Sequence, residues 1–339
     1  MQKWKPLDLL AFLWSWYKGD EMKENPKIVV AGAGSIGCFV GGLLQSAGCD
    51  ITFLGRQRIA DELSENGLHL SDYAGLKKQV AHDKIRITTD PATLSDAQIV
   101  LVCVKSGATL KIAEEIQKHC PSGAIVASLQ NGVKNASVLK EHLANYDVRA
   151  GMVPFNVVQM GQGRFHRGTS GDMIVETGSP NIAAILDVEN LRTQASNDMQ
   201  SVLWGKLLVN LNNALNALSD VPLVEELSNR EWRLKLASQM TEGLSVMKAE
   251  GITPKPPSPV PAWVLPHILR LPTPIFRAVA KQMLAIDPQA RSSMWEDLQQ
   301  GRKTEIDELQ GEIISLGEKH GVPTPMVKAI AAEIKKMEQ

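Results

Sequence analysis

Three side chains of one segment could carry chemistry, because they combine a cation and two amides at helical spacing. Lys206, Asn210 and Asn213 follow one another at i, i+4 and i+7 in LWGKLLVNLNN, so a helix places them on one face. Their neighbours are Leu and Val, so this face is either a solvent-exposed stripe or a polar pocket. In a pocket, a lysine can stabilise developing negative charge and donate a proton. In the exposed alternative, the lysine stem only covers apolar neighbours.

A second set of candidates follows two predicted strands. The apolar run 99–104 leads into Lys105 and Ser106, and the run 124–129 leads into Gln130-Asn131-Gly132. In an open α/β sheet, the carboxyl ends of the strands face the ligand crevice. Lys105 and Asn131 are therefore candidate ligand contacts, although Asn-Gly is also typical of a plain turn.

Carboxylates gather near the C-terminus, in SSMWEDLQQGRKTEID, where Glu305 is one of several acids. Their spacing alone is typical of ordinary surface charge. The four cysteines show neither a CxxC pair nor the spacing of metal ligands. We therefore expect reduced thiols and no metal site.

A dinucleotide-binding pattern occurs in the context that it requires. The β-branched run 27–31 enters a G-x-G-x-x-G loop, and the apolar residues after the loop recur on one face of a helix. The glycines permit a tight turn, a close approach of a pyrophosphate and helix packing, and the helix N-terminus attracts the anion. The alternative is a glycine turn without a ligand. The expected cofactor contacts in this loop are Gly32, Ala33, Gly34, Ser35, Ile36 and Gly37.

The end of the second predicted strand, 51–54, indicates which dinucleotide binds. A site that prefers NAD places an acid there, to accept from the ribose 2′-hydroxyl. This chain instead has Gly55-Arg56-Gln57-Arg58, and its first acid is Asp61. A guanidinium can hold a 2′-phosphate through two hydrogen bonds. The sequence therefore favours NADP(H), with Arg56 at the 2′-phosphate, unless Arg56 is only a solvated surface charge.

The pattern of elements predicts an N-terminal α/β Rossmann-type domain followed by an all-α domain. Strands and helices alternate to about residue 197, with a further strand at 148–153 and edge hairpins in 163–175. Helical periodicity then continues to the end, and the longest helices are expected at 203–218 and 292–316. The expected divisions are an N-terminal arm at 1–26, a nucleotide-binding domain at 27–195 and a helical domain at 196–339.

One segment of the helical domain, 253–288, has an unusual composition. It holds nine prolines among mostly apolar residues, so helix is repeatedly interrupted. Long segments of this kind are usually functional or disordered. We expect it to be a partly mobile cover over the substrate site.

The composition excludes several classes of partner. The 36 Lys and Arg residues and 37 Asp and Glu residues leave a net charge of -1, so no basic excess points to nucleic acid. The apolar stretch 7–17 contains Asp8 and is far shorter than the ~20 residues that cross a bilayer. It belongs to a dispensable arm ahead of a start at Met22, or to an amphipathic helix on a membrane surface. We expect no membrane span and, given the reduced thiols, a cytoplasmic protein.

Five motifs follow one another in the chain: GAGSIG, VKS, LQNG, LWGKLLVN, and SSMWEDLQQGRKTEIDELQG followed by KHGVPTP. Together they resemble the ketopantoate reductase (2-dehydropantoate 2-reductase) family, from about residue 27 to residue 325. The resemblance implies C-terminal helices like those of 6-phosphogluconate dehydrogenase. It also implies reduction of 2-dehydropantoate to (R)-pantoate by NADPH, in the route to pantothenate and coenzyme A.

The resemblance also implies roles for individual residues. Lys206 falls on the family's catalytic lysine, and Glu305 on its essential glutamate, which also orients the nicotinamide ribose. Asn210 falls on the substrate-binding asparagine one turn after the lysine. Ser293 falls on the serine that holds the substrate carboxylate.

For the cofactor, the resemblance agrees with the residues chosen above. Lys105 and Asn131 fall on family residues that line the crevice between cofactor and substrate, and Asn131 serves both ligands. Arg56 falls on the arginine that binds the 2′-phosphate. No metal is implied, because the ammonium of Lys206 does the electrophilic work.

Two features depart from the family pattern, and both concern the substrate. The family commonly has a second asparagine two turns after the lysine, followed by Pro-Leu-Thr-Ala. Here the corresponding string, Asn213-Ala214-Leu215-Asn216-Ala217, begins one residue earlier. Asn213 is the best match, whereas strict helical register selects Ala214. The second departure is the segment 253–288, which is longer and more apolar than in plain members of the family.

Three functions remain open on the sequence. They are reduction of 2-dehydropantoate, reduction of a bulkier 2-oxo acid, and a non-catalytic NADP(H)-binding redox sensor. Lys206 and Glu305 together argue against the sensor, which needs no proton donor. The expected ligand is a small-molecule 2-oxo acid, and the helical domain is where a homodimer would form.

Overall fold

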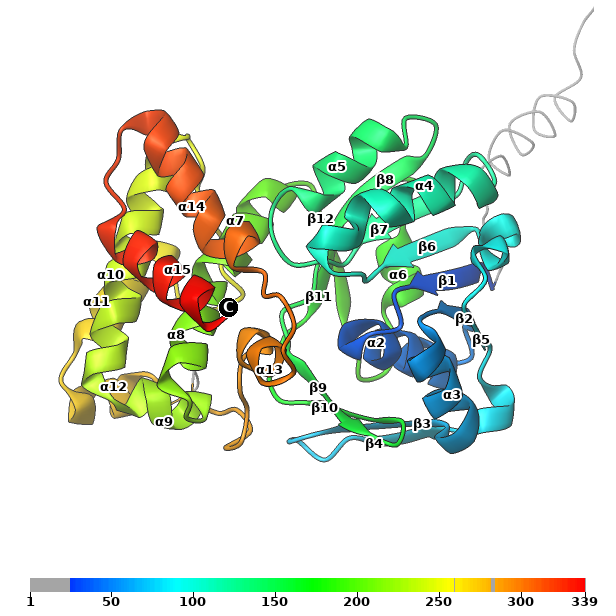
Figure 1. Ribbon diagram of the computed structural model, residues 1–339, viewed down its shortest axis with the longest axis horizontal. Helices are drawn as coiled ribbons and strands as arrows, with labels where there is room; N and C mark the ends of the chain where they lie inside the picture. The colour runs from blue at the N-terminus through cyan, green and yellow to red at the C-terminus, as the bar shows by residue number, and fades with distance from the viewer. Residues whose placement is uncertain (1–24, 259, 282–283, 339) are drawn as a thin grey trace, which may run out of the picture.

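The computed structural model of the chain describes residues 25–258, 260–281 and 284–338. Two lobes lie side by side in Figure 1, an α/β lobe built on a large sheet and an all-helical lobe. This architecture confirms the predicted fold class. The expected N-terminal arm lies outside the described residues as far as residue 24, and the boundary near residue 195 stays a prediction.

The large sheet has the strand order β12-β11-β8-β7-β6-β1-β2-β5 within the described residues. The strands from β5 to β8 pair in parallel, and β11 pairs antiparallel with β8. In a doubly wound sheet, a dinucleotide binds where the strand order reverses, which here is beside β1. The strands are β1 (Lys27–Ala31), β2 (Asp50–Leu54), β5 (Ile87–Thr88), β6 (Ile99–Val102), β7 (Ile125–Ser128), β8 (Asp147–Met152), β11 (Met173–Glu176) and β12 (Thr193–Ser196).

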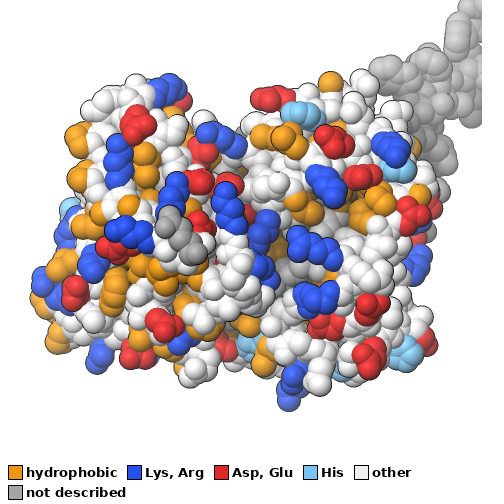
Figure 2. All heavy atoms as spheres, viewed as in Figure 1, with side chains coloured by type: hydrophobic (Ala, Val, Ile, Leu, Met, Phe, Trp, Pro, Cys, Tyr) orange, Lys and Arg blue, Asp and Glu red, His pale blue; other side chains and the backbone are white. Residues whose placement is uncertain are grey.

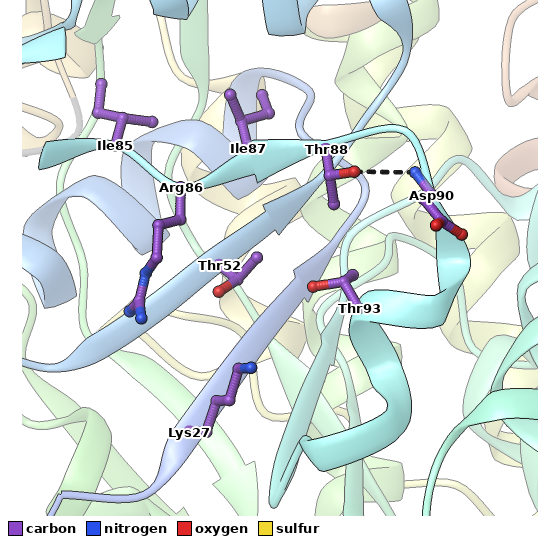
Figure 3. Close-up of a pocket in the computed structure, with 8 residues that line it drawn as sticks. All are labelled: Lys27, Thr52, Ile85, Arg86, Ile87, Thr88, Asp90 and Thr93. Atoms are coloured by element: carbon purple, nitrogen blue, oxygen red, sulfur yellow. Dashed lines mark hydrogen bonds between the residues drawn. The ribbon is translucent and has the colours of Figure 1, made fainter. Parts of the chain in front are cut away.

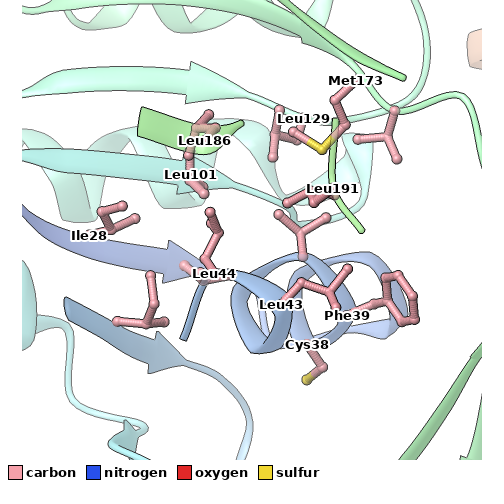
Figure 4. Packing of buried hydrophobic residues seen from close by; sticks show 14 of the residues in the cluster. Ile28, Cys38, Phe39, Leu43, Leu44, Leu101, Leu129, Met173, Leu186 and Leu191 are labelled. Carbon is pink, nitrogen blue, oxygen red and sulfur yellow. The ribbon is translucent and has the colours of Figure 1, made fainter. Parts of the chain in front are cut away.

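Alternate residues of β1 face two different helical layers. Ile28 and Val30 pack into the cluster that holds α2, α3 and α6, part of which Figure 4 shows. Val29 and Ala31 pack into the cluster that holds α4 and α5. Because both faces are covered, the central strands are apolar throughout. The helices are α2 (Ser35–Ser46), α3 (Gln57–Asn66), α4 (Thr109–His119), α5 (Asn135–His142) and α6 (Ile182–Leu186).

A smaller sheet, in the order β4-β3-β10-β9, covers the outer side of α2. The hairpins expected in 163–175 are partly confirmed, because β9 and β10 pair antiparallel while β11 joins the large sheet instead. The strands β3 and β4 were not predicted. The bounds are β3 (Leu68–Asp72), β4 (Lys77–Val80), β9 (Val157–Gly161) and β10 (Arg164–Arg167).

The helical lobe packs its helices around a second apolar cluster. Its longest helix is α10, and α14 and α15 pack beside it at the C-terminal end of the chain. The helices are α7 (Met199–Asn210), α8 (Asn212–Ser219), α9 (Leu223–Ser228), α10 (Arg230–Ala249), α11 (Leu265–Arg270), α12 (Thr273–Val279), α13 (Ser293–Gln299), α14 (Ile306–His320) and α15 (Pro325–Met337). Short 3₁₀ turns occur at His82–Lys84, Pro91–Asp96, Ser106–Ala108 and Ala262–Val264.

Both long helices expected in this lobe are interrupted, so the predictions of continuous helices at 203–218 and 292–316 are wrong. The first breaks at Leu211, whose carbonyl oxygen accepts from the side-chain amide of Gln310 at 3.0 Å. The second ends at Gln299, just before Gly301 with its left-handed φ of 59°, and helix resumes only at Ile306. Because of this second break, Glu305 is the N-cap of α14, and its backbone does not have helical dihedral angles.

The proline-rich segment 253–288 is more integrated than expected. Leu265, Leu269 and Phe276 belong to the apolar core, and the fully buried Arg233 donates to the carbonyl oxygens of residues 269 and 271. The expectation of a mobile cover is therefore wrong for the helical part of this segment. Prolines at the N-termini of α11 and α12 start helices rather than prevent them.

Among the described residues, no helix has both the length and the apolar character needed to cross a bilayer.

Gly205 permits a close backbone contact within the helical lobe. A Cβ at this position of α7 would lie 2.1 Å from the carbonyl oxygen of Lys255. The backbone N of Lys255 also donates to the carbonyl of Ser201 at 2.8 Å, so the chain is held against α7 there.

We expect Gly205→Ala to lower the free energy of unfolding by about 1–3 kcal/mol, because backbone has to move to admit the methyl group. Gly311→Ala in α14 is the matched control, since its Cβ would meet its nearest neighbour at an ordinary 3.5 Å. Alanine there should stabilise the helix by about 0.5–1 kcal/mol. Urea unfolding measures both, and equal stability of the two variants would contradict the packing argument.

Candidate active site

The glycine loop between β1 and α2 has the geometry of a phosphate cradle. Gly34 is the N-cap of α2 and offers no side-chain cap, and a Cβ there would meet no atom within 4 Å. A Cβ on Gly37 would lie 2.1 Å from the carbonyl oxygen of Gly32, which explains the third glycine. The loop therefore exposes the N-terminus of a helix to an open space, which suits a pyrophosphate.

Arg56 lies at the end of β2, as the sequence predicts. Its side chain is exposed and forms no ion pair with any other described residue. Arg58, two residues later, instead pairs with Glu62 at 3.1 Å. Arg56 is thus the guanidinium at this strand end that is available to a phosphate.

Glu305 reaches from the helical lobe to the ends of β6 and β7. Its Oε1 accepts from the backbone N and Oγ of Ser106, at 3.2 and 3.0 Å. Its Oε2 accepts from the Nδ2 of Asn131 at 3.2 Å. The structure therefore brings together two predicted site residues, Glu305 and Asn131, that are 174 positions apart.

A buried polar network supports this contact from behind. The Nδ2 of Asn135 donates to Ser106 Oγ at 2.9 Å and to the carbonyl of Asn131 at 2.5 Å. Its Oδ1 accepts from Thr109, which in turn accepts from Gln130 at 2.7 Å. Sequence reasoning missed Asn135 and Thr109. The available signal was an asparagine four residues after Asn131, at the first position of a helix.

Lys105 does not point freely into the crevice. It forms an ion pair with Asp297, whose side chain is buried and also contacts Arg302 at 3.0 Å. Burial and the charge of Asp297 raise the pKa of the neighbouring Glu296 to about 7. Lys105 is thus a paired cation, unlike Arg56.

Lys206 is partly buried on α7, and its Nζ donates to the carbonyl oxygen of Pro154 at 3.1 Å. Among the described residues, no carboxylate forms an ion pair with it. Burial lowers the pKa of Lys206 to about 8. The result is an ammonium that gives up a proton near neutral pH. No direct contact joins Lys206 to Glu305 in the described structure.

The candidate substrate residues are accessible to different extents. Asn210 is buried, Asn213 is half-buried, and Ser293 is exposed at the start of α13; none of their side chains hydrogen-bonds to another described residue. Ala214 is fully buried in the apolar core. Asn213, rather than Ala214, therefore presents its side chain outside the core.

Figure 2 shows a notch between the two lobes, with Lys and Arg side chains gathered along it. Two lysine–carboxylate pairs cross this boundary, Lys105 with Asp297 and Lys134 with Glu312, and His166 also contacts Asp287 across it at 2.8 Å. A separate hollow of about 440 Å³ lies elsewhere, at the edge of the large sheet (Figure 3). The two cations that line this hollow, Lys27 and Arg86, are already paired with acids. They therefore differ from Arg56 and Lys206, which have no carboxylate partner among the described residues.

Comparison with known proteins agrees with this geometry. Residues 28–180 match the sequence model of the family described as ketopantoate reductase PanE/ApbA, and residues 198–338 match its C-terminal counterpart. A 2-dehydropantoate 2-reductase of Archaeoglobus fulgidus is 30% identical and covers 87% of this chain and 92% of its own length. The protein of that name from Halobacterium salinarum is 29% identical, with coverage of 90% and 96%. A solved PanE/ApbA family ketopantoate reductase from Ralstonia eutropha JMP134 superposes with a TM-score of 0.77 at 29% identity, covering 92% of this chain and 98% of that one. The chain therefore belongs to the ketopantoate reductase family.

Proposed function

We propose that this protein reduces 2-dehydropantoate to (R)-pantoate with NADPH, in pantothenate biosynthesis. The observation that carries the proposal is Lys206, an ammonium without a carboxylate partner among the described residues and with a pKa lowered to about 8 by burial. Family membership over both lobes supports the same reaction.

The reaction needs a hydride and a proton, and a side chain of the protein donates the proton. Bound NADPH supplies the hydride to the ketone carbon of the substrate. Lys206 stabilises the negative charge that develops on the ketone oxygen, and then gives it a proton to form the hydroxyl group. The pKa of about 8 keeps Lys206 largely protonated at neutral pH and still able to release its proton.

The cofactor site that we propose is the open edge of the α/β lobe. Residues 32–37 hold the pyrophosphate at the N-terminus of α2, and Arg56 holds the 2′-phosphate. Lys105 and Asn131 line the crevice beside the nicotinamide. Glu305 shares this crevice, since Asn131 already donates to it.

The substrate site that we propose lies on the helical lobe. Ser293 receives the substrate carboxylate, and Asn210 and Asn213 bind its other polar groups. Glu305 binds a substrate hydroxyl and orients both Lys206 and the nicotinamide ribose. The absence of partners on Ser293, Asn210 and Asn213 among the described residues supports these assignments, because such side chains are available to a ligand.

A bulkier 2-oxo acid is the second candidate substrate. The observation that favours it is the displaced asparagine, since Ala214 is buried in the core and the half-buried side chain beside it is Asn213, one residue earlier than the family's second asparagine. Loss of NADPH absorbance with a panel of 2-oxo acids tests both candidates. Turnover of 2-dehydropantoate supports the first and turnover of larger acids alone supports the second. Tight NADPH binding without any turnover would refute both and favour a redox sensor.

We also propose that the chain acts in the cytoplasm as a homodimer formed through the helical lobe. Trp263, Ile275 and Val279 are 67%, 51% and 57% exposed there, and the last two share one face of α12. Exposed apolar side chains of this size are typical of interaction surfaces. Light scattering after size exclusion would show a monomer if the proposal is wrong.

Lys206→Ala should lower kcat by about 10²–10⁴-fold, because a positioned general acid contributes that much. NADPH should still bind. In the parent, kcat/KM should fall as the pH rises through about 8, when the ammonium loses its proton. Lys206→Arg should abolish this alkaline limb, since guanidinium stays charged.

Lys328→Ala is the control for removal of a lysine. Lys328 is exposed on α15 and pairs with Glu318 on α14, so kcat should stay at the parent value. A parent-like kcat in Lys206→Ala would show that Lys206 is only a structural lysine.

Arg56→Ala should weaken NADPH binding by roughly 10- to 100-fold, the equivalent of one charge-assisted hydrogen-bonded pair. NADH has no 2′-phosphate, so its affinity should barely change. Arg58→Ala provides the control, since that side chain pairs with Glu62. Fluorescence titration measures each affinity, and equal losses for both cofactors would contradict the assignment.

A further inference from the structure

Three polar side chains interrupt the apolar core of the helical lobe, and the proposed chemistry uses none of them. Asn216 on α8 and Glu226 on α9 are 0% and 1% exposed, and Ser292 is 3% exposed. Burying an amide and a carboxyl is unfavourable unless they are hydrogen-bonded. Apolar residues would fill this space without that requirement, so the arrangement of the three groups needs a reason.

Asn216 connects α8 to the residue that begins α13. Its Oδ1 accepts from the backbone N of Ser292 at 2.8 Å. Its Nδ2 donates to Glu226 Oε2 at 2.8 Å and to the carbonyl of Val221 at 2.9 Å. Each side of the amide is occupied, so its orientation is fixed.

Glu226 completes the cluster without adding a buried charge. Burial raises the pKa of Glu226 to about 8, although hydrogen bonds from Asn216 and Asn212 oppose the rise. At neutral pH the carboxyl is therefore mostly protonated, and its Oε2 still accepts from Asn216. The cluster is thus a set of neutral groups that hold one another in place.

Ser292 extends this anchoring to two candidate substrate residues. Its Oγ donates to the backbone carbonyl of Asn213 at 2.9 Å. The same oxygen accepts from the backbone N of Trp295 at 3.1 Å and so caps α13. One hydroxyl therefore joins the backbone of Asn213 to the helix that begins with Ser293.

We propose that Asn216 is a positioning residue for substrate recognition, which acts through Ser292 to fix Ser293 relative to Asn213. Asn216 is fully buried, so it would act through other residues and not by contact with a ligand. This inference rests on the proposed function, because the placement of Ser293 and Asn213 matters only if they bind a 2-oxo acid. It adds a determinant of substrate affinity that lies behind the binding residues.

The contacts of the α/β lobe cannot replace this anchor. Asn156 donates to the carbonyl of Arg291 at 2.9 Å, and Lys105 pairs with Asp297. Both contacts come from the other lobe and locate α13 against the nucleotide-binding side. Only a contact within the helical lobe sets the distance from α13 to Asn213, and Asn216 supplies one at a fully buried position.

The test is Asn216→Leu, which keeps the side-chain volume and removes all three hydrogen bonds. The KM for the 2-oxo acid should rise by about tenfold or more, the expected effect of losing a buried hydrogen bond that orders a binding group. The affinity for NADPH should stay within about twofold, and kcat should fall less than KM rises.

Arg233→Met is the matched control. Arg233 is fully buried in the same lobe and donates to the carbonyls of residues 227, 228, 269 and 271, none of which belongs to the cluster. This variant should lose stability like Asn216→Leu but keep the parent KM. An equal rise in KM for both variants would reduce Asn216 to a general stabilising role and overturn the proposal.

Ser292 provides a second approach, should Asn216→Leu fail to fold. Ser292→Ala removes the bond to Asn213 and should raise KM, whereas Ser292→Thr keeps a hydroxyl and should restore it. A parent-like KM in Ser292→Ala would overturn the proposal. The two hypotheses fail differently: a parent without turnover refutes the proposed function, and an active parent with unchanged KM in the variants refutes positioning alone.

Discussion

One carboxylate constrains how the two lobes meet. Glu305 sits in the gap between α13 and α14, and Ser106 and Asn131 at the strand ends donate three hydrogen bonds to its oxygens. Hydrogen bonds to a charged group contribute about 1.5–3 kcal/mol each, and a buried network behind them fixes both donors. The edge that receives Glu305 is also the edge at which a doubly wound sheet binds a dinucleotide. The contact between the lobes and the candidate active site are therefore the same place.

The two lysines near this edge, Lys105 and Lys206, differ in burial and in their partners. Lys105 is half-exposed and neutralised by the buried Asp297, whereas Lys206 is partly buried and has only a carbonyl oxygen as partner. Desolvation disfavours the charged form of a lysine. Lys206 is thus prepared to exchange a proton near neutral pH. The same physical effect, burial, raises the pKa of Glu226 and removes its charge from the core.

Much of this organisation could be predicted from the sequence, for reasons that differ between elements. The central strands are apolar on both faces, so β1 and β6 were located almost to the residue. The break at Leu211 was missed because its carbonyl turns toward Gln310, 99 residues away, which no local pattern reveals. The second break has a local signal, the left-handed Gly301, which the expected helix ran through. The strands β3 and β4 were missed because they are short and partly exposed. Motifs placed Glu305 and Asn131 together, whereas the signal for Asn135, an asparagine four residues after Asn131, was too weak by itself to show that Asn135 orients their contact.

Two adjacent residues of α7, Gly205 and Lys206, have different roles: the first permits a close backbone contact, and the second is the candidate proton donor. Gly205 lets the backbone at Lys255 lie against the helix, where any side chain would collide. Adjacent residues on a helix point about 100° apart, so Lys206 faces a different direction, toward Pro154 of the α/β lobe. The proline-rich chain therefore packs against the helix beside the proposed proton donor. Because packing holds the backbone of Lys206 on one side, only its side chain would have to adjust in the reaction that we propose, and such preorganisation favours a general acid.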